Sequence, residues 1–410
     1  MSGRSDSPTA IALRRFLRRP VARIGLALLT FFALIAIYAP LLASPVAILW
    51  WDAEGLRLPL LADLFNRNQY GAIHHLLFNV LIPVLPLMLL LVWWGGRRGW
   101  GGGRRLLVGT GVVLVAMGLC LIPLLPQGGE LRPLWTQRPP TVETWQHYRH
   151  EQEAGNDVWA LFPLVPHGFR DKYEVYQAPG VISVETGARF WLGTDDRGAS
   201  VLARMLYGAR VSLTIGIIAV GISMFIGVVI GAASGFFGGW TDLLLQRAVE
   251  IMMSFPTFIL VLLAVAVLGR DIYLMIVIFG LTGWAGIARL VRGEFLREMG
   301  REYVLAAQTL GLPRWRIMFR HILPNVATPL LISATFGIAG MVLAESSLAF
   351  LGLGDDSVPS WGALLNVGRQ QVQYSWLIWV PGLAIFALVS ALNLVGNGLR
   401  EALGPKGQRR

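Results

Sequence analysis

The side chains of this 410-residue chain that are best suited to chemistry, such as binding a metal ion, lie together at positions 147 to 151. His147, His150 and Glu151 have three- and four-residue spacings, which bring side chains together on one face of a helix, as a metal pair requires. A solvated helix face explains the same spacing without any metal. We therefore expect no metal site, and we keep the metal pair as the alternative.

Motifs of several enzyme classes are missing from the sequence. Its two lysines, Lys172 and Lys406, both stand outside any G-x-x-x-x-G-K-[ST] motif, so no phosphate-binding loop of that kind is present. H-E-x-x-H and G-x-S-x-G are also absent, and the single cysteine, Cys120, cannot form an intrachain disulfide. We expect no catalytic residue, no cofactor bound by this chain, and no enzymatic activity of its own.

A few charged residues stand in or beside long apolar runs, where charges are costly and usually face protein or water. Glu345 is the deepest of them, within the run 326–350. It is either a structural hydrogen-bonding group or a residue that lines a pathway, and we favour the first. Asp242, Arg247 and Glu250 have spacings that allow salt bridges on one helix face, so we interpret them as structural.

The composition indicates a membrane protein that crosses the bilayer several times. Hydrophobic residues make up 55% of the chain and charged residues 14%, against about 25% charged in soluble domains. Several apolar runs approach the roughly 20 residues that span a bilayer. The net charge of +11 would suggest nucleic acid in a soluble protein. Here arginine-rich loops retained in the cytoplasm explain it, and we expect no nucleic-acid partner.

We predict an all-α bundle of about eight transmembrane helices. The expected spans are Val21–Ala43, Leu76–Trp94, Leu106–Leu125, Val211–Phe237, Ala248–Leu268, Ile272–Val291, Val326–Phe350 and Trp376–Leu399. The expected parts are a tail (1–20), the first helix (21–43), an external loop with an extra hairpin (44–126), an external region (127–210), a helical core with a loop at 292–325 (211–400) and a second tail (401–410).

Arginines place both termini and the hairpin turn on the cytoplasmic side, because positive charge is retained there. Arginine pairs stand at 97–98 and 104–105 in that turn, and Lys406, Arg409 and Arg410 end the chain. We expect the extra hairpin to be peripheral to any pathway. The external region is expected to pack rather than to be disordered, since it carries many aromatic residues.

Two shorter features are expected to be structural. In the segment 192–195 (LGTD), Thr194 or Asp195 is expected to cap a helix that starts near Arg197. Further on, glycines recur at every fourth position, at 227, 231 and 235. Such a stripe of small residues permits close packing of helices in a membrane.

The stretch 301–325 is predicted to form two short helices between apolar spans. Tyr303, Ala306, Ala307 and Leu310 share one helix face, and Glu302 stands at the helix start, where the dipole favours anions. Gly311 is predicted to cap the first helix, and Pro313 to open a second one, Arg314–Ile322, that ends before Pro324. From periodicity alone, this is either a helix on the membrane surface or a docking element.

The residues of this stretch resemble the cytoplasmic EAA loop in permease subunits of bacterial ABC importers. The resemblance lies in the paired alanines, in Gly311 four residues after Ala307, and in the sequence Ile-Leu-Pro that ends at Pro324. Glu302 and Tyr303 match the "EY" of the peptide branch, whereas Leu305 stands where the motif has its Glu. The segments around 190–213 and Glu345 also resemble oligopeptide, dipeptide and nickel permeases, and the long N-terminal anchor is similar to the second permease of such operons.

The resemblance implies a type I ABC importer fold in the bacterial inner membrane. It implies that Glu302, Tyr303, Ala306, Ala307, Leu310, Gly311 and Pro324 couple the chain to an ATPase subunit. It also implies a homologous second permease, two ATPase subunits that use ATP and Mg²⁺, a periplasmic binding protein and membrane lipid as partners. A peptide importer is expected. The alternatives are a nickel or other small-solute importer, a polytopic membrane transferase, and a membrane scaffold.

Overall fold

The computed structural model describes residues 14–127, 130–184 and 186–403. Its chain divides into two compact units, each described here by itself. Unit 1 comprises 1–32, 212–366 and 380–410, and unit 2 comprises 33–211 and 367–379. The predicted roles of Lys406, Arg409 and Arg410 lie outside the described residues.

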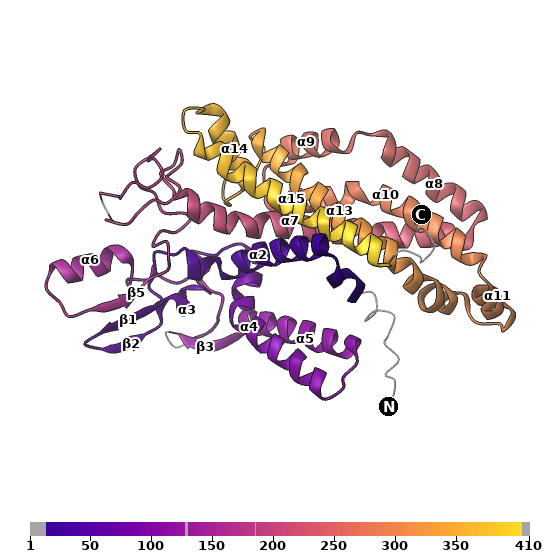
Figure 1. Ribbon diagram of the computed structural model, residues 1–410, viewed down its shortest axis with the longest axis horizontal. Helices are drawn as coiled ribbons and strands as arrows, with labels where there is room; N and C mark the ends of the chain where they lie inside the picture. Colours follow the sequence, from indigo (N-terminus) through magenta and orange to yellow (C-terminus); the bar gives the residue numbers. More distant parts are fainter. Residues whose placement is uncertain (1–13, 128–129, 185, 404–410) are drawn as a thin grey trace. The chain divides into compact units, whose positions relative to one another are not determined.

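The elements of the chain are mostly helical (Figure 1). The helices are α2 (Pro20–Leu42), α3 (Pro59–Asp63), α4 (Ile73–Arg97), α5 (Gly102–Leu121), α6 (Trp145–Glu153), α7 (Val201–Phe237), α8 (Gly239–Ser254), α9 (Thr257–Leu268), α10 (Ile272–Met299), α11 (Glu302–Thr309), α12 (Arg314–Arg316), the π-helix η1 (Ile317–Ile322), α13 (Leu323–Phe350), α14 (Trp361–Gln370) and α15 (Trp376–Leu403). The strands are β1 (Leu49–Asp52), β2 (Gly55–Arg57), β3 (Pro123–Gln127), β4 (Glu130–Pro133) and β5 (Trp159–Leu161).

Seven helices among the described residues are long and apolar enough to cross a membrane, and the bent pair α8–α9 makes an eighth span if it is counted as one. The predicted polytopic helical bundle is therefore confirmed. The predicted span Ala248–Leu268 is interrupted, because the chain bends by 74° between α8 and α9. Pro256 lies at that break and cannot continue the hydrogen-bond ladder of α8.

Two other predicted boundaries differ from the structure. α7 begins at Val201, four residues after the helix start predicted near Arg197 and ten residues before the predicted membrane span, so its first turns belong to the region predicted to be external. At the other boundary, η1 leads directly into α13, although Pro324 was expected to end a helix there. Pro324 is the second residue of α13, directly after the π-helical turn η1.

The glycine stripe of α7 packs directly against α10 within unit 1, as predicted. A Cβ atom added at Gly231 would lie 2.4 Å from the backbone oxygen of Ala288, and one added at Gly227 would lie 2.7 Å from Cβ of Ile287. At Gly235 the added atom would meet Cβ of Phe295 at 2.7 Å. The two helices can approach this closely only because these positions lack side chains.

Unit 2 contains the small sheets of the chain. β1 pairs antiparallel with both β2 and β5, so residues near the first span pair with residues more than one hundred positions later. Trp145, Tyr148 and Phe162 pack ring against ring beside this sheet. Three aromatic residues of the region predicted to be external therefore pack together, as expected.

A fully buried arginine connects three helices of unit 2. Arg210 of α7 donates to the backbone oxygens of Ala36 at 2.6 Å and Ile37 at 3.0 Å on α2. It also donates to Oδ1 of Asn79 on α4 at 2.8 Å. Pro40 lies four residues after Ala36 and has no N–H, so α2 cannot itself supply a helical donor to the Ala36 oxygen. Arg210 supplies that missing hydrogen bond.

Candidate functional site

The loop between α10 and α13 is built on the predicted helix–turn–helix. Arg301 precedes α11, and Gly311 ends it with φ of +71°, a conformation that glycine adopts without strain. The N–H of Leu312 donates to the oxygen of Ala307 at 3.1 Å, and the N–H of Gly311 to that of Gln308 at 2.9 Å. These bonds form a Schellman cap, so the glycine stop predicted from sequence is confirmed.

A compact apolar cluster holds this loop in place. We define the inner cluster as the buried residues Ala232, Val291, Phe295, Val304, Ala307, Ile317, Ile322, Val326 and Leu330. It joins α7, α10, α11, η1 and α13 within unit 1. Because a short helix such as α11 is not stable alone in water, this packing is what stabilises it.

The predicted docking face needs one correction. Ala307 is only 5% exposed and lies in the inner cluster, where it packs within its own chain and not on the surface. Its small size is explained by the close packing beneath α11. Tyr303, Ala306 and Leu310 remain on the surface, with Leu310 80% exposed, and Glu302, Gly311 and Pro324 are exposed as well.

Residues that the sequence did not single out enlarge the exposed apolar surface. We define the loop surface as Tyr303, Leu305, Ala306, Leu310, Trp315 and Phe319, all of them exposed. Trp315 and Phe319 are 61% and 56% exposed and come from α12 and η1. In the sequence, these two aromatic residues stand among three arginines of the same segment. That pattern could have indicated an exposed aromatic surface. A surface on which several exposed apolar side chains gather beside basic residues is typical of a site that another protein covers.

A polar network fixes the two ends of the loop to each other. The hydroxyl of Tyr303 donates to Oε2 of buried Glu298 at 2.7 Å, and Nδ2 of Asn325 donates to the Tyr303 oxygen at 2.9 Å. Burial raises the pKa of the Tyr303 phenol, and the nearby Glu298 acts in the same direction. Tyr303 therefore stays neutral and donates at physiological pH. Neither Glu298 nor Asn325 was singled out from the sequence.

An ion pair at the base of α8 anchors the loop-bearing helix α10. Both carboxylate oxygens of Asp242 accept from Arg292, at 2.6 and 2.7 Å. The predicted pairing of Asp242 along its own helix is thus wrong, because a partner on α10 is nearer. Arg247 and Glu250 do pair with each other, at 2.6 Å, as predicted.

Glu345 is buried in α13 and bonded to its own chain. Its Oε1 accepts from the hydroxyl of Ser360 at 2.6 Å, and Oε2 accepts from Ser346 at 3.3 Å. Ser360 immediately precedes α14, so this carboxyl group joins the end of the loop 351–360 to α13. The structural interpretation of Glu345 has a direct contact behind it, and the pathway-lining alternative has no contact that tests it.

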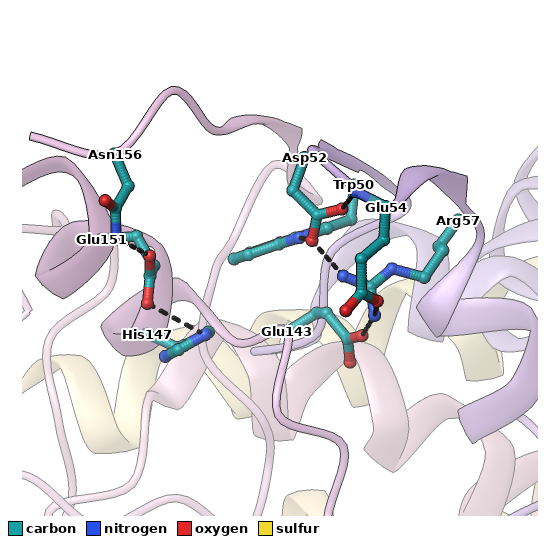
Figure 2. Close-up of polar contacts among 8 residues, drawn as sticks. All are labelled: Trp50, Asp52, Glu54, Arg57, Glu143, His147, Glu151 and Asn156. Carbon is teal, nitrogen blue, oxygen red and sulfur yellow. Dashed lines mark hydrogen bonds and ion pairs between the residues drawn. The ribbon is translucent and has the colours of Figure 1, made fainter.

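The histidine cluster lies on α6 of unit 2 (Figure 2). Nε2 of His147 lies 3.6 Å from Oε1 of Glu151, whose other oxygen accepts from Asn156. The His147 ring stacks on Trp50 at 5.6 Å between centroids. No group of three metal-ligating side chains occurs among the described residues. The spacing is thus accounted for by a polar contact between His147 and Glu151 on the helix surface.

A polar cavity of about 380 Å³ in unit 2 contains two acidic residues. Asp63 accepts from Asn66 at 3.2 Å and from Thr141 at 3.1 Å, and Asp171 accepts from the N–H of Gly168 at 2.6 Å. Burial raises the pKa of both carboxyl groups. Since each acid has donors from its own chain, the contacts explain both as parts of the local fold.

Two family models match separate parts of the chain. Residues 227–408 match the model of the binding-protein-dependent transport system inner membrane component. Residues 7–51 match the N-terminal transmembrane domain of oligopeptide transport permease C.

Three relatives illustrate the similarity. The oligopeptide permease protein OppC of Haemophilus influenzae is 42% identical over 218 residues, which are 53% of this chain and 70% of that protein. The peptidoglycan permease protein YejE of Agrobacterium fabrum is 40% identical over 64% of this chain and 70% of its own length. The glutathione permease protein GsiD of Pectobacterium atrosepticum is 37% identical over 66% and 92%. This chain belongs to the family of oligopeptide- and dipeptide-type permease subunits of ABC importers.

Proposed function

We propose that this chain is one of the two membrane subunits that form the pathway of a peptide importer. As a permease subunit it is a transporter component and not an enzyme, since ATPase activity in this family lies in separate subunits. The names of the relatives, which include oligopeptide, dipeptide and glutathione systems, support a peptide or a peptide-like substrate.

The observation that carries the coupling role is the loop surface. It exposes aliphatic and aromatic side chains on a loop that the inner cluster and the Glu298–Tyr303–Asn325 bonds hold in one shape. A preorganised apolar surface lowers the entropic cost of docking. We assign this surface to contact with an ATPase subunit that binds ATP and Mg²⁺. A homologous second permease, a second ATPase subunit and a periplasmic binding protein complete the proposed complex.

Leu310 gives the sharpest test of this role. Leu310→Asp should leave folding and insertion normal, because the side chain is 80% exposed, but it should place a charge in a desolvated contact. Loss of a central apolar anchor costs about 2 kcal/mol or more, so co-purification of the ATPase subunits should fall by roughly thirtyfold. The measurement is the amount of ATPase retained on tagged permease at increasing dilution.

Gln308→Asp is the matched control for Leu310→Asp, since Gln308 is exposed on the same helix and lies outside the loop surface. It should retain the ATPase subunits nearly as well as the unaltered protein. Equal retention by both variants would show that the loop surface does not contact the ATPase. Equal and complete loss would point to general disruption of α11 and not to an interface.

Orientation in the inner membrane is a second proposal. We place both termini, the turn between α4 and α5 and the loop 292–325 in the cytoplasm, because arginines cluster in these segments. In a Cys120→Ser background, Arg98→Cys should resist a membrane-impermeant thiol reagent on intact spheroplasts, whereas Glu153→Cys should react. Both positions are exposed in the structure, so burial would not account for a failure to react. The reverse labelling pattern would overturn the orientation.

A further inference from the structure

The turn of the α4–α5 hairpin concentrates positive charge and indole rings. We define the hairpin tip as residues 93–105, which hold the tryptophans Trp93, Trp94 and Trp100 and the arginines Arg97, Arg98, Arg104 and Arg105. No acidic residue occurs in the sequence between Asp63 and Glu130. The tip therefore carries four positive charges with no acidic neighbour along the chain.

Arginines and tryptophans of the tip stack on each other in pairs. The guanidinium carbon of Arg97 lies 3.9 Å from the ring centroid of Trp93, and that of Arg98 lies 3.7 Å from the centroid of Trp94. Arg104 lies 4.5 Å from the centroid of Trp100. These cation–π contacts hold the side chains in place and leave the guanidinium edges available for hydrogen bonds.

Two glycines allow the tip to close tightly. A Cβ atom added at Gly95 would lie 2.6 Å from Cε3 of Trp100, so that indole rests directly on the backbone of α4. A Cβ atom at Gly96 would lie 3.3 Å from Nη1 of Arg105, whose Nε donates to the oxygen of Trp100 at 2.9 Å. The tip is thus a packed structure in which the arginines have defined positions.

The helices beneath the tip present apolar side chains outward along their length. Only 12% of the apolar stretch of α5 is buried within the protein. Several leucines of the two helices are each more than half exposed, including Leu89, Leu90, Leu107 and Leu114. The 25 residues of α4 extend about 37 Å, enough for a hydrocarbon core of about 30 Å. With these surfaces in lipid, the tip lies at the headgroup layer, where tryptophan rings also prefer to sit.

We propose that the hairpin tip binds the phosphate headgroups of anionic phospholipids. Charge complementarity favours this occupant, because four arginines face a layer of negative charge and can make bidentate bonds to phosphate oxygens. The two family models match residues 227–408 and 7–51 and leave the hairpin unmatched. The hairpin would then act as a lipid anchor added to the permease core.

The test is lipid binding by the purified protein in detergent, followed by native mass spectrometry with phosphatidylglycerol or phosphatidylcholine. Each basic residue near an anionic surface contributes about fivefold to binding, so changing Arg97, Arg98, Arg104 and Arg105 together to Gln should weaken phosphatidylglycerol binding on the order of several hundredfold. Phosphatidylcholine binding should not change. Added salt should weaken phosphatidylglycerol binding to the unaltered protein.

Two controls separate the tip from general effects of charge. Arg189→Gln removes an exposed arginine that also stacks on a tryptophan, Trp191, but lies outside any candidate span, and it should leave lipid binding unchanged. Changing the four tip arginines to Lys keeps the charge and should retain most of the phosphatidylglycerol preference. Size-exclusion profiles and melting curves of all variants check that they fold.

Several outcomes would overturn the proposal. Equal binding of the two lipids by the unaltered protein would do so, as would unchanged phosphatidylglycerol binding by the Gln variant. If that variant kept its lipid preference but lost the ATPase subunits, the occupant would be a protein. Displacement of lipid by inorganic phosphate, at an ionic strength where chloride has no effect, would identify a site for free anions.

Discussion

Replacing Ala307 with aspartate should detach α11 from the inner cluster and abolish transport, although the substitution lies on a loop between spans. Ala307 is almost fully buried beside Val304, which is completely buried, and the site offers no partner for a carboxylate among the inner-cluster residues. Burying an unpaired charge costs several kcal/mol, more than an eight-residue helix can supply by itself. The helix should therefore leave its seat rather than bury the charge.

Limited proteolysis of the purified subunit is the decisive measurement for Ala307→Asp, because it measures how accessible the loop is to protease when no partner subunit is bound. Cleavage within 301–325 should become much faster, and ATPase stimulation in the reconstituted complex should disappear. Ala306→Asp is the matched control. Ala306 is the neighbour of Ala307 but its side chain is exposed, so this substitution should leave the rate of proteolysis unchanged. Identical protease resistance in the two variants would contradict the burial of Ala307.

Removing Arg210 should be the most destabilising single change in unit 2. Arg210→Met leaves the Ala36 oxygen without a donor and Asn79 without its charged partner, all within a buried region. Leaving a buried acceptor without its donor costs about 1–3 kcal/mol for each group. The expected result is a large fall in the thermal stability of the protein in detergent, together with reduced membrane yield.

A second substitution isolates the hydrogen bond that Arg210 makes to α2. Pro40→Ala restores an N–H that can bond to the Ala36 oxygen along the helix, so Arg210→Met should cost less in that background. We expect a coupling energy of about 1 kcal/mol from the four melting curves of the double-mutant cycle. Strict additivity would show that Arg210 does not replace the missing helical donor.

The same contacts change the expectation for the extra hairpin. Its peripheral position was inferred because the family motifs lie elsewhere in the sequence. In the structure, Asn79 and His75 at the base of α4 both contact Arg210. Deleting residues 48–126, which include the hairpin, would remove both contacts, so assembly of the complex should fail. The apolar part of the hairpin that is farther from His75 and Asn79 can be altered with little effect on this network.

Local signals predicted the features that depend on local physics. Gly311 predicted the helix stop because a left-handed cap needs glycine, and the stripe at 227, 231 and 235 predicted close packing because three small residues share one helix face. The length of the apolar runs predicted the membrane spans, because a helix needs about 20 apolar residues to cross a bilayer. Each of these follows from a few neighbouring residues and needs no knowledge of the tertiary fold.

Features that depend on distant partners were not predictable from the sequence. Ala307 and Ala306 are adjacent and identical in type, and only the position of the inner cluster decides which of them is buried. Asp242 found its partner fifty residues away on α10, although closer basic residues were available in the sequence. The membrane span was predicted to begin only at Val211 because the first turns of α7 are held by polar contacts, such as the ion pair of Arg204 with Asp195, and not by a continuous apolar run.

The contact between Arg210 and Ala36 also has a consequence in time. The two residues are 174 positions apart, so at synthesis rates of about 5–20 residues per second, the ribosome makes Arg210 roughly 9 to 35 seconds after Ala36. Throughout that interval Pro40 leaves the Ala36 carbonyl without a helical donor. The end of the first membrane helix must therefore remain hydrated, or in contact with the insertion machinery, until α7 arrives. Its final position in the bilayer is completed by a segment that is made much later than the helix itself.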